Sequence, residues 1–317
     1  MGRTVGVKLH VAGVVVTELT GVDTADGAAS PSKQAGLQPG DRITHVGAAE
    51  INGAKALRDA VNRSGGRAVT LRVERADSRL SLTLTPAKAA DNTYKIGALI
   101  RDCVAGIGTV TFCDPATGLF GALGHGIGDN ENSLIPFEGG DVYGAAVQEI
   151  ARGAAGKPGE LRGAFVSDES IGRLYANTEH GVFGRLVGES LWAGRDPIPV
   201  AAAAEVRCGP ASVLANVQGD EVRAFAIEIV KIYGPDIPNS RHFMLKVVDP
   251  ELLDLTAGIV QGMSGSPILQ NGKLVGAVTH VLVGDPKRGY GLFLEHMFKS
   301  AQAYLPQEEA GALRKVS

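Results

Sequence analysis

Residues Gly258–Leu269, which read GIVQGMSGSPIL, carry the strongest structural signal in the sequence. At their centre, Gly262, Ser264 and Gly265 stand in a run of small residues between two apolar flanks. Such a run predicts a sharp turn between strands, because glycine tolerates backbone dihedrals that other residues avoid. The turn would expose the Ser264 hydroxyl, and the N–H groups of Gly262 and Ser264 could converge as an oxyanion hole. A plain Gly/Ser/Pro turn is the alternative interpretation.

The centre of this stretch resembles the nucleophile turn of chymotrypsin-like serine proteases. Residues 262–267 read GMSGSP, and the general pattern of that turn is Gly-x-Ser-Gly-[Gly/Ser]-Pro. The resemblance implies that Ser264 attacks a peptide carbonyl. It also predicts that a general base and an orienting acid lie elsewhere in the chain.

Composition limits the classes of function. The chain has 317 residues, enough for two domains, with 44% hydrophobic and 21% charged residues. Its net charge of −3, with no basic block, argues against nucleic acid as the main partner. Three cysteines without CxxC spacing give neither a disulfide framework nor a zinc site. We also expect no metal and no organic cofactor, because attack by a serine hydroxyl with a histidine base requires neither.

The first segment, residues 4–87, resembles a PDZ domain of the bacterial type. We expect strands at Val5–Leu9 and Gly13–Val16, and a helix over Ala54–Arg63 that Asn52 caps. Residues 35–43, AGLQPGDRI, are the most specific part of the resemblance. PDZ domains bind an extended peptide as an added strand beside a sheet edge.

By that resemblance, the peptide groove lies between Val5–Leu9 and the helix Ala54–Arg63. The backbone N–H groups near Val5, Gly6 and Val7 would receive a peptide carboxylate. The alternative is that the glycines of this segment only shape a hairpin.

The second segment, residues 95–317, is rich in short strands. Closely spaced β-branched or alternating runs, separated by Gly, Pro, Asp and Asn, predict sandwiches or barrels. With the serine turn in the last third, paired six-stranded β-barrels of the chymotrypsin type follow. We expect strands at 107–112, 118–123, 142–150, 161–166, 181–186, 224–232, 242–248 and 273–283, and a helix near 294–304.

The best candidate for the general base is His125. It follows an apolar run, stands between Gly124 and Gly126, and precedes Ser264 as a residue of the first barrel would. His280 is the rival, because it lies close after Ser264 in the chain and could line the pocket. As base it would break the two-barrel order, so we rank it second.

The orienting acid is less constrained by the sequence. It should bind the second imidazole nitrogen, which fixes the tautomer and stabilises the imidazolium. The residues leave four candidates open: Asp129, Asp141, Asp249 and Asp254.

Taken together, the chain resembles the stage IV sporulation protein B family of signalling serine peptidases. The resemblance rests on the leading PDZ-like segment, on LGHGI at 123–127, on VDPELL at 248–253 and on GIVQGMSGSPI at 258–268. It implies that His125, Asp249 and Ser264 are the catalytic residues. The choice of Asp249 over Asp254 comes from this resemblance alone.

The same resemblance implies a biological role. Members of the family act in regulated proteolysis between the two membranes of a developing spore. They cleave themselves and a membrane-protein inhibitor, which releases an intramembrane protease that matures a late sigma factor. Protein substrates, peptide segments at the PDZ-like domain and an extracytoplasmic location follow as expectations. Members usually carry an N-terminal membrane anchor, and this sequence shows none.

Two competing interpretations remain. A quality-control protease of the high-temperature-requirement type also combines a trypsin-like unit with PDZ domains, but there the PDZ follows the protease. Its serine turn also usually has a second glycine where this chain has Ser266. The other interpretation is a peptide-binding scaffold with a protease fold that is latent.

Overall fold

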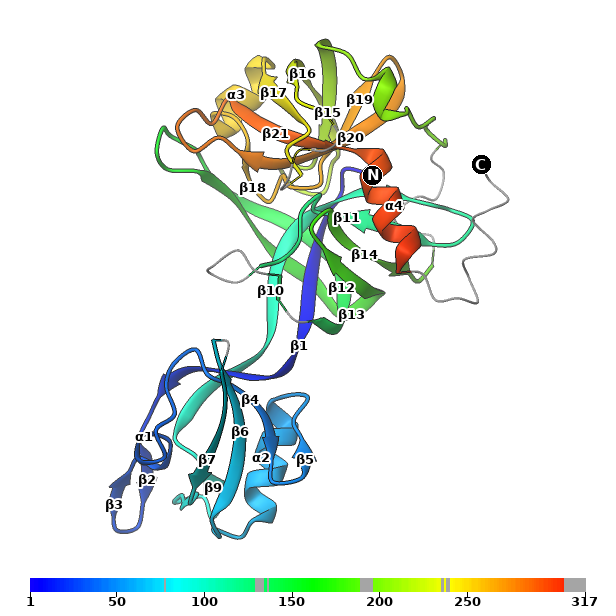
Figure 1. Ribbon diagram of the computed structural model, residues 1–317. Coiled ribbons are helices and arrows are strands. Elements are labelled where there is room, and N and C mark those ends of the chain that lie inside the picture. Colours follow the sequence, from blue (N-terminus) through cyan, green and yellow to red (C-terminus); the bar gives the residue numbers. More distant parts are fainter. Residues whose placement is uncertain are drawn as a thin grey trace. The chain divides into compact units, whose positions relative to one another are not determined.

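The computed structural model describes residues 1–76, 78–128, 134–135, 137–188, 196–234, 237 and 240–304. The described part is mainly β, as the sequence predicts (Figure 1). It divides into two compact units. Unit 1 comprises Met1–Lys8, Ala105–Ile135 and Gly139–Ser317, and unit 2 comprises Leu9–Val104 and Pro136–Glu138.

The limits of the units differ from the expected domains 4–87 and 95–317. They fall inside three long strands, β1 (Thr4–Leu19), β10 (Ala98–Cys113) and β12 (Phe137–Ala151), so each strand contributes to both units. Where the sequence predicted two strands at Val5–Leu9 and Gly13–Val16, the structure has the single strand β1. The residues between them, His10 to Ala12, continue the extended backbone.

Unit 2 is a small α+β unit. Its sheet runs in the order β1, β4, β6 and β7, and α2 contributes Leu57, Ala60 and Val61 to its core. The elements that the chain adds after β1 are β2 (Val22–Thr24), β3 (Gly27–Ala29), α1 (Pro31–Gln34), β4 (Arg42–Val46), β5 (Ala49–Glu50), α2 (Ala54–Arg63), β6 (Val69–Arg75), β7 (Ser78–Leu84), β8 (Ala87–Lys88) and β9 (Tyr94–Lys95).

Helix α2 has the predicted limits but not the predicted cap. Its N-cap residue is Gly53, which makes no side-chain cap bond, rather than Asn52. The amide of Ala54 instead donates to Asp102 Oδ2 at 2.9 Å. A carboxylate from β10, distant in sequence, thus satisfies the first turn of this helix and complements its dipole.

An ion pair in unit 2 joins a buried carboxylate to a partly exposed guanidinium. Asp41 is fully buried, and its carboxylate accepts from Arg75 Nε at 2.6 Å, Arg75 Nη2 at 2.8 Å and the Gln38 amide at 2.8 Å. We expect Arg75→Met to lower the Tm of unit 2 by at least about 5 °C, because the carboxylate would stay buried without its cation. Arg79→Met is the control, since Arg79 is exposed beside Glu74, and it should change Tm by less than about 2 °C. Equal effects in a thermal melt would contradict the prediction.

The first half of unit 1 is a ring of six strands. The sheet runs β10, β11, β14, β13, β12 and β1, and an additional pairing of β10 with β1 joins its ends. The new strands are β11 (Leu119–Ala122), β12 (Phe137–Ala151), β13 (Gly159–Thr178) and β14 (Gly181–Leu186). A short strand, β18 (Val260–Gln261), pairs with β13 in parallel.

The second half of unit 1 is a closed six-stranded barrel. Its order is β15, β16, β17, β21, β20 and β19. Valine, isoleucine and phenylalanine side chains fill its interior, among them Phe225, Ile227 and Phe243. The elements are β15 (Gly209–Ala215), β16 (Arg223–Ile232), β17 (Phe243–Val247), β19 (Pro267–Gln270), β20 (Lys273–Val281) and β21 (Arg288–Phe293), with the 3-10 helix η1 (Ala203–Glu205) and helix α3 (Pro250–Thr256). The paired-barrel prediction is confirmed.

Helix α4 (Leu294–Ala303) joins the two halves of unit 1. It packs against β11 and β14 on one side and against β20 and β21 on the other (Figure 1). Leu294, Met297 and Ala301 are its buried residues, at the one-turn spacing of a single helix face. The helix therefore covers the junction of the two barrels.

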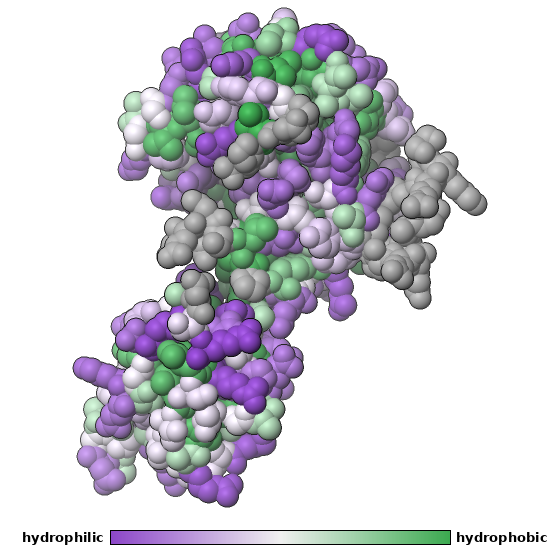
Figure 2. Space-filling view, viewed as in Figure 1, coloured by the Kyte–Doolittle hydropathy of each residue, from purple (hydrophilic) through white to green (hydrophobic). Residues whose placement is uncertain are grey.

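The surface of both units is mixed in polarity. Figure 2 shows polar and charged residues over each unit on the face in view, with apolar residues in small groups between them. Within the described part of the chain, no helix has the length and apolar character that crossing a membrane requires.

Candidate active site

The turn that carries Ser264 needs glycine at two positions. Gly262 has φ +96° and Gly265 has φ +90°, which side chains disfavour. A Cβ atom on Gly265 would lie 2.2 Å from the carbonyl oxygen of Thr109. The small residues of the sequence stretch are therefore required by the close approach of β10.

Strand β10 fixes the main chain of this turn. The Thr109 amide donates to the Ser264 carbonyl at 3.1 Å, and Thr109 Oγ1 donates to the Gly262 carbonyl at 3.0 Å. Thr111 Oγ1 donates to the Gly265 carbonyl at 2.7 Å. Three carbonyls of the turn thus accept hydrogen bonds from β10, which is also a strand of the six-stranded ring in the first half of unit 1.

The expected oxyanion donors are the amides of Gly262 and Ser264. Neither amide donates in a turn or loop hydrogen bond between main-chain groups of the described residues, whereas the Gly265 amide donates to Val278 O and the Ser266 amide to Met263 O. Two amides two residues apart beside a serine hydroxyl have the spacing that an oxyanion hole requires. Their role stays a prediction.

The hydroxyl of Ser264 makes a hydrogen bond to strand β20. Ser264 Oγ donates to the carbonyl oxygen of Thr279 at 3.0 Å. The residue after Thr279 is His280, so the nucleophile candidate lies beside the rival histidine.

His125 follows β11 through a strained turn. Leu123 has φ +69° and Gly124 has φ +70°, so the chain turns abruptly out of the strand. His125 Nδ1 lies 2.9 Å from the carbonyl oxygen of Gly126. Because a carbonyl only accepts, Nδ1 carries the proton, and Nε2 has the lone pair that a general base needs.

Burial disfavours the charged form of His125. Desolvation lowers its pKa below the ordinary value of 6.5, and the hydrogen bond to the Gly126 carbonyl opposes that shift. His125 is therefore neutral, and able to accept a proton, at neutral pH.

The structure brings His125 and Ser264 to the same place on β20. A Cβ atom on Gly124 would lie 3.2 Å from the Val278 carbonyl, so the turn before His125 rests on this strand. The rings of His125 and His280 are 5.1 Å apart between centroids, and Ser264 is bonded to Thr279. An imidazole and a serine hydroxyl from distant parts of the sequence thus both lie against residues 278–280 of β20.

The structure does not bring Asp249 to His125. Asp249 is the N-cap of α3, and its carboxylate accepts from the amides of Glu251 and Leu252 at 3.0 Å each and of Ala226 at 3.1 Å. Burial is the largest single influence on the pKa of Asp249 and raises it, but the hydrogen bonds from the three amides and the charge of Arg223 together lower that pKa below its ordinary value. Its role as the orienting acid stays a prediction.

The other acid candidates lie elsewhere. Asp254 is in α3, one turn beyond the cap, and Asp141 is in β12 opposite Arg173. Asp129 lies outside the described residues.

The expected peptide-binding residues Val5, Gly6 and Val7 lie in unit 1. Val5 and Val7 are buried in the first part of β1, and a Cβ atom on Gly6 would lie 2.2 Å from the Phe165 ring. Helix α2, expected on the other side of the groove, belongs to unit 2. The role of these three residues in peptide binding stays a prediction.

The residue that accepts the Ser264 hydrogen bond, Thr279, makes further hydrogen bonds through its side chain, which the sequence did not reveal. Thr279 Oγ1 donates to the Ser240 carbonyl at 3.1 Å, and Ser240 Oγ donates to the Glu179 carbonyl at 2.8 Å. Ser240 is buried and has φ +55°. Its place between β16 and β17 gives no sequence signal, because the bonds join residues more than 35 positions apart.

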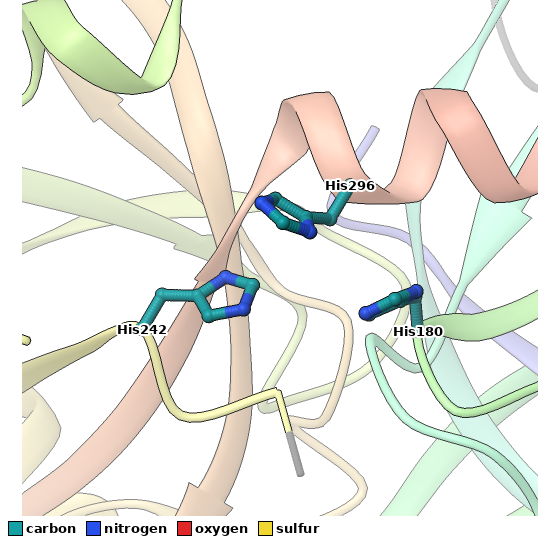
Figure 3. A group of neighbouring side chains, drawn as sticks. All are labelled: His180, His242 and His296. Atoms are coloured by element: carbon teal, nitrogen blue, oxygen red, sulfur yellow. The ribbon is translucent and has the colours of Figure 1, made fainter. Parts of the chain in front are cut away.

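Three histidines lie close together in unit 1, as Figure 3 shows. His180 precedes β14, His242 precedes β17, and His296 is in α4; one nitrogen from each lies within 4.8 Å of the others. Cation coordination is the obvious chemistry to test. However, the Phe293 amide donates to His242 Nδ1 at 3.1 Å, which places the proton of neutral His242 on Nε2. A metal at Nε2 would have to remove that proton, so the donor set does not fit a three-histidine metal site.

Comparison with known proteins gives two family matches. The model described as SpoIVB peptidase S55 matches residues 92–298, and a PDZ domain model matches residues 4–85. No curated protein matches the chain.

Solved structures show weaker likeness. The PDZ domain of an SdrC-like protein from Listeria monocytogenes has 20% identity and a TM-score of 0.24, over 29% of this chain and 90% of that one. The active form of the Rv3671c protease from M. tuberculosis has 16% identity and a TM-score of 0.36, over 64% of this chain and 74% of that one.

Proposed function

Because this chain belongs to the SpoIVB peptidase S55 family and is a serine peptidase, we propose that it is an endopeptidase with Ser264 as nucleophile and His125 as base. The observation that supports the proposal is that Ser264 and His125 lie against consecutive residues of β20. Ser264 Oγ is bonded to Thr279 O, and the His125 ring lies beside that of His280. The tautomer of His125 also has its lone pair on Nε2.

The residues support the usual course of acyl transfer. His125 Nε2 takes the proton of Ser264 as the hydroxyl oxygen attacks a peptide carbonyl, and the amides of Gly262 and Ser264 stabilise the oxyanion. His125 then gives its proton to the leaving amine, and water hydrolyses the acyl-enzyme. Before this, the Ser264 hydroxyl must turn from the Thr279 carbonyl towards His125, an adjustment that apo active sites commonly need.

The biological role that we propose rests on the resemblance to the family. We propose regulated proteolysis during sporulation, in an extracytoplasmic space, on protein substrates that include this chain and a membrane-protein inhibitor. The family name and the PDZ match support this proposal. By the same resemblance, the PDZ-like segment would bind an extended peptide.

Reaction with a fluorophosphonate tests the proposed chemistry without knowledge of the substrate. The probe forms a covalent bond only with an activated serine, so the wild-type chain should be labelled in gel fluorescence, and peptide mapping should place the label on Ser264. Absence of labelling would favour the latent scaffold, which the bond from Ser264 to Thr279 also permits. A label on another serine would overturn the assignment.

A substitution series at Asp249 separates capping from catalysis. Because its bonds in this structure go to amides, we expect Asp249→Asn to keep most of the activity and the Tm, since asparagine also caps helices well. Asp249→Ala should lose about 1 kcal/mol of unfolding free energy. A fall of about 10⁴-fold in kcat for Asp249→Asn at unchanged Tm would show instead that Asp249 is the orienting acid. In that case the Asp249 carboxylate would have to give up at least one of its hydrogen bonds from main-chain amides in order to bind His125 during the reaction.

On the acid side of the pH–activity profile, which we call the acid limb, the midpoint should lie below pH 6.5. The base acts only when neutral, and burial lowers the pKa of His125 from that value. Activity should therefore persist as pH falls through 6.5, and it should decline only as pH passes the lowered pKa. The rate of fluorophosphonate labelling between pH 4 and 8 measures this limb. A midpoint above 6.5 would contradict the burial of a neutral base.

A further inference from the structure

His280 carries a buried nitrogen that no described residue satisfies. Its Nδ1 atom has no hydrogen-bond partner in the part of the chain that the structure describes, although the side chain as a whole is only partly buried. Buried polar atoms are nearly always paired, so an exception calls for an explanation, and catalytic sites are one place where exceptions occur.

The position of His280 identifies the group that could use this nitrogen. Its ring lies 5.1 Å from the ring of His125 between centroids, with planes tilted by 34°. A straight N–H···N bond of about 2.9 Å between two imidazoles places their centroids roughly 5 Å apart. The spacing therefore already suits such a bond, and only the orientation of the rings has to change.

His125 needs an acceptor when it becomes charged. As imidazolium it has two N–H groups: one serves the leaving amine, and the other needs a partner. In the structure that partner is the carbonyl of Gly126, while the carboxylate of Asp249 is engaged by three amides. The groups that shift the pKa of His125 do not include a carboxylate.

We infer that His280 is a positioning residue for His125: its buried Nδ1 accepts a hydrogen bond from the Nδ1–H of the imidazolium that forms when His125 takes the proton of Ser264. In accepting this bond, His280 replaces the Gly126 carbonyl as the partner of that N–H group. The inference rests on the proposed function. His280 holds its own proton on Nε2 in this state, and no proton passes to it. It acts through His125 and does not touch the substrate.

The electrostatic surroundings keep His280 neutral. Burial, His125 and Arg241 together lower the pKa of His280 to about 4. The cationic neighbours are thus His125, once protonated, and the Arg241 guanidinium, which lies over the ring of Tyr290 on the adjacent strand β21. A neutral imidazole is a hydrogen-bond acceptor, whereas a protonated one would repel the imidazolium of His125.

Three variants test the inference, each measured by its rate of fluorophosphonate labelling between pH 4 and 8. His280→Phe keeps a flat aromatic ring, which is larger than imidazole, and removes both nitrogens. His280→Asn places an amide oxygen near the position of Nδ1, and His280→Gln places its amide near that of Nε2. We expect labelling to fall roughly 10- to 100-fold in His280→Phe, the loss typical of a hydrogen bond to a charged group. The acid limb should also move to lower pH, because the imidazolium loses an acceptor.

The variants are compared in pairs. His280→Asn should recover most of the rate and the wild-type limb, and His280→Gln should resemble His280→Phe. A purely structural role would lower Tm without moving the acid limb. If His280→Phe does not fold, the comparison of His280→Asn with His280→Gln gives the same answer.

Some outcomes would overturn the inference. One such outcome is that His280→Phe is labelled at the wild-type rate and keeps the wild-type midpoint on the acid side of the pH profile. The other is that His280→Asn and His280→Gln lose the same fraction of the labelling rate. Failure of the proposed function is recognised separately: it would appear as labelling that survives Ser264→Ala, whatever the His280 variants do.

Discussion

Ser264→Ala should abolish fluorophosphonate labelling and self-cleavage, with a loss of about a million-fold in kcat. The size follows from the loss of the only group that forms the covalent intermediate, and single removals of serine or histidine from such a site have comparable effects. The fold should be unaffected, because the main chain of the turn is held by carbonyl bonds from Thr109 and Thr111 and not by the Ser264 side chain. Gel fluorescence and intact-mass measurement of the purified chain check both statements.

Ser266 offers a matched control in the same turn. Its side chain is fully buried, and its hydroxyl has no partner among the described residues. Ser266→Ala should therefore label at the wild-type rate, with Tm unchanged or slightly raised, because a buried hydroxyl without a partner contributes little stability. If Ser266→Ala lost labelling as completely as Ser264→Ala, the distinction between the two serines would fail.

His125→Ala should match the loss of Ser264→Ala, at about a million-fold. Without the imidazole, nothing among the described residues around Ser264 is placed to take its proton at neutral pH, since the pKa of His280 is lowered to about 4. The double variant Ser264→Ala, His125→Ala should be no worse than either single variant, because residues that act as a unit are not additive.

His45 is the control for the histidine substitution. It lies on β4 in unit 2, where its Nδ1 is 3.2 Å from Thr44 Oγ1. His45→Ala should leave labelling unchanged. Residual activity above about one per cent in His125→Ala would point to His280 as the base, the alternative that the sequence left open.

Most of the fold was predictable because local patterns and burial agree. Alternating apolar residues predicted strands such as β14, whose observed limits match Gly181–Leu186, and periodicity placed α2 and α4 within one residue of their ends. The nucleophile turn was readable because its glycines meet a local steric demand at Gly262 and Gly265. Strands β15 and β21 were missed, since their glycine and alanine content weakens the pattern.

The partners of the site residues could not be predicted in the same way. Hydrogen bonds such as that from Thr109 to Gly262, or from Ser240 to Glu179, join residues whose separation in the chain carries no signal. The cap of α2 by Asp102 and the continuity of β1 through two units are of the same kind. They depend on which strands become neighbours when the barrels close.

Patterns of neighbouring residues were enough to predict the turn around Ser264, the glycines beside His125 and the β-barrel class. The contacts of the site came from the folded molecule: the His280 ring lies near that of His125, Asp249 caps α3, and the Ser264 hydroxyl donates to the Thr279 carbonyl. Strand pairing places such side chains by register across the barrels, and register is set by the packing of the whole unit.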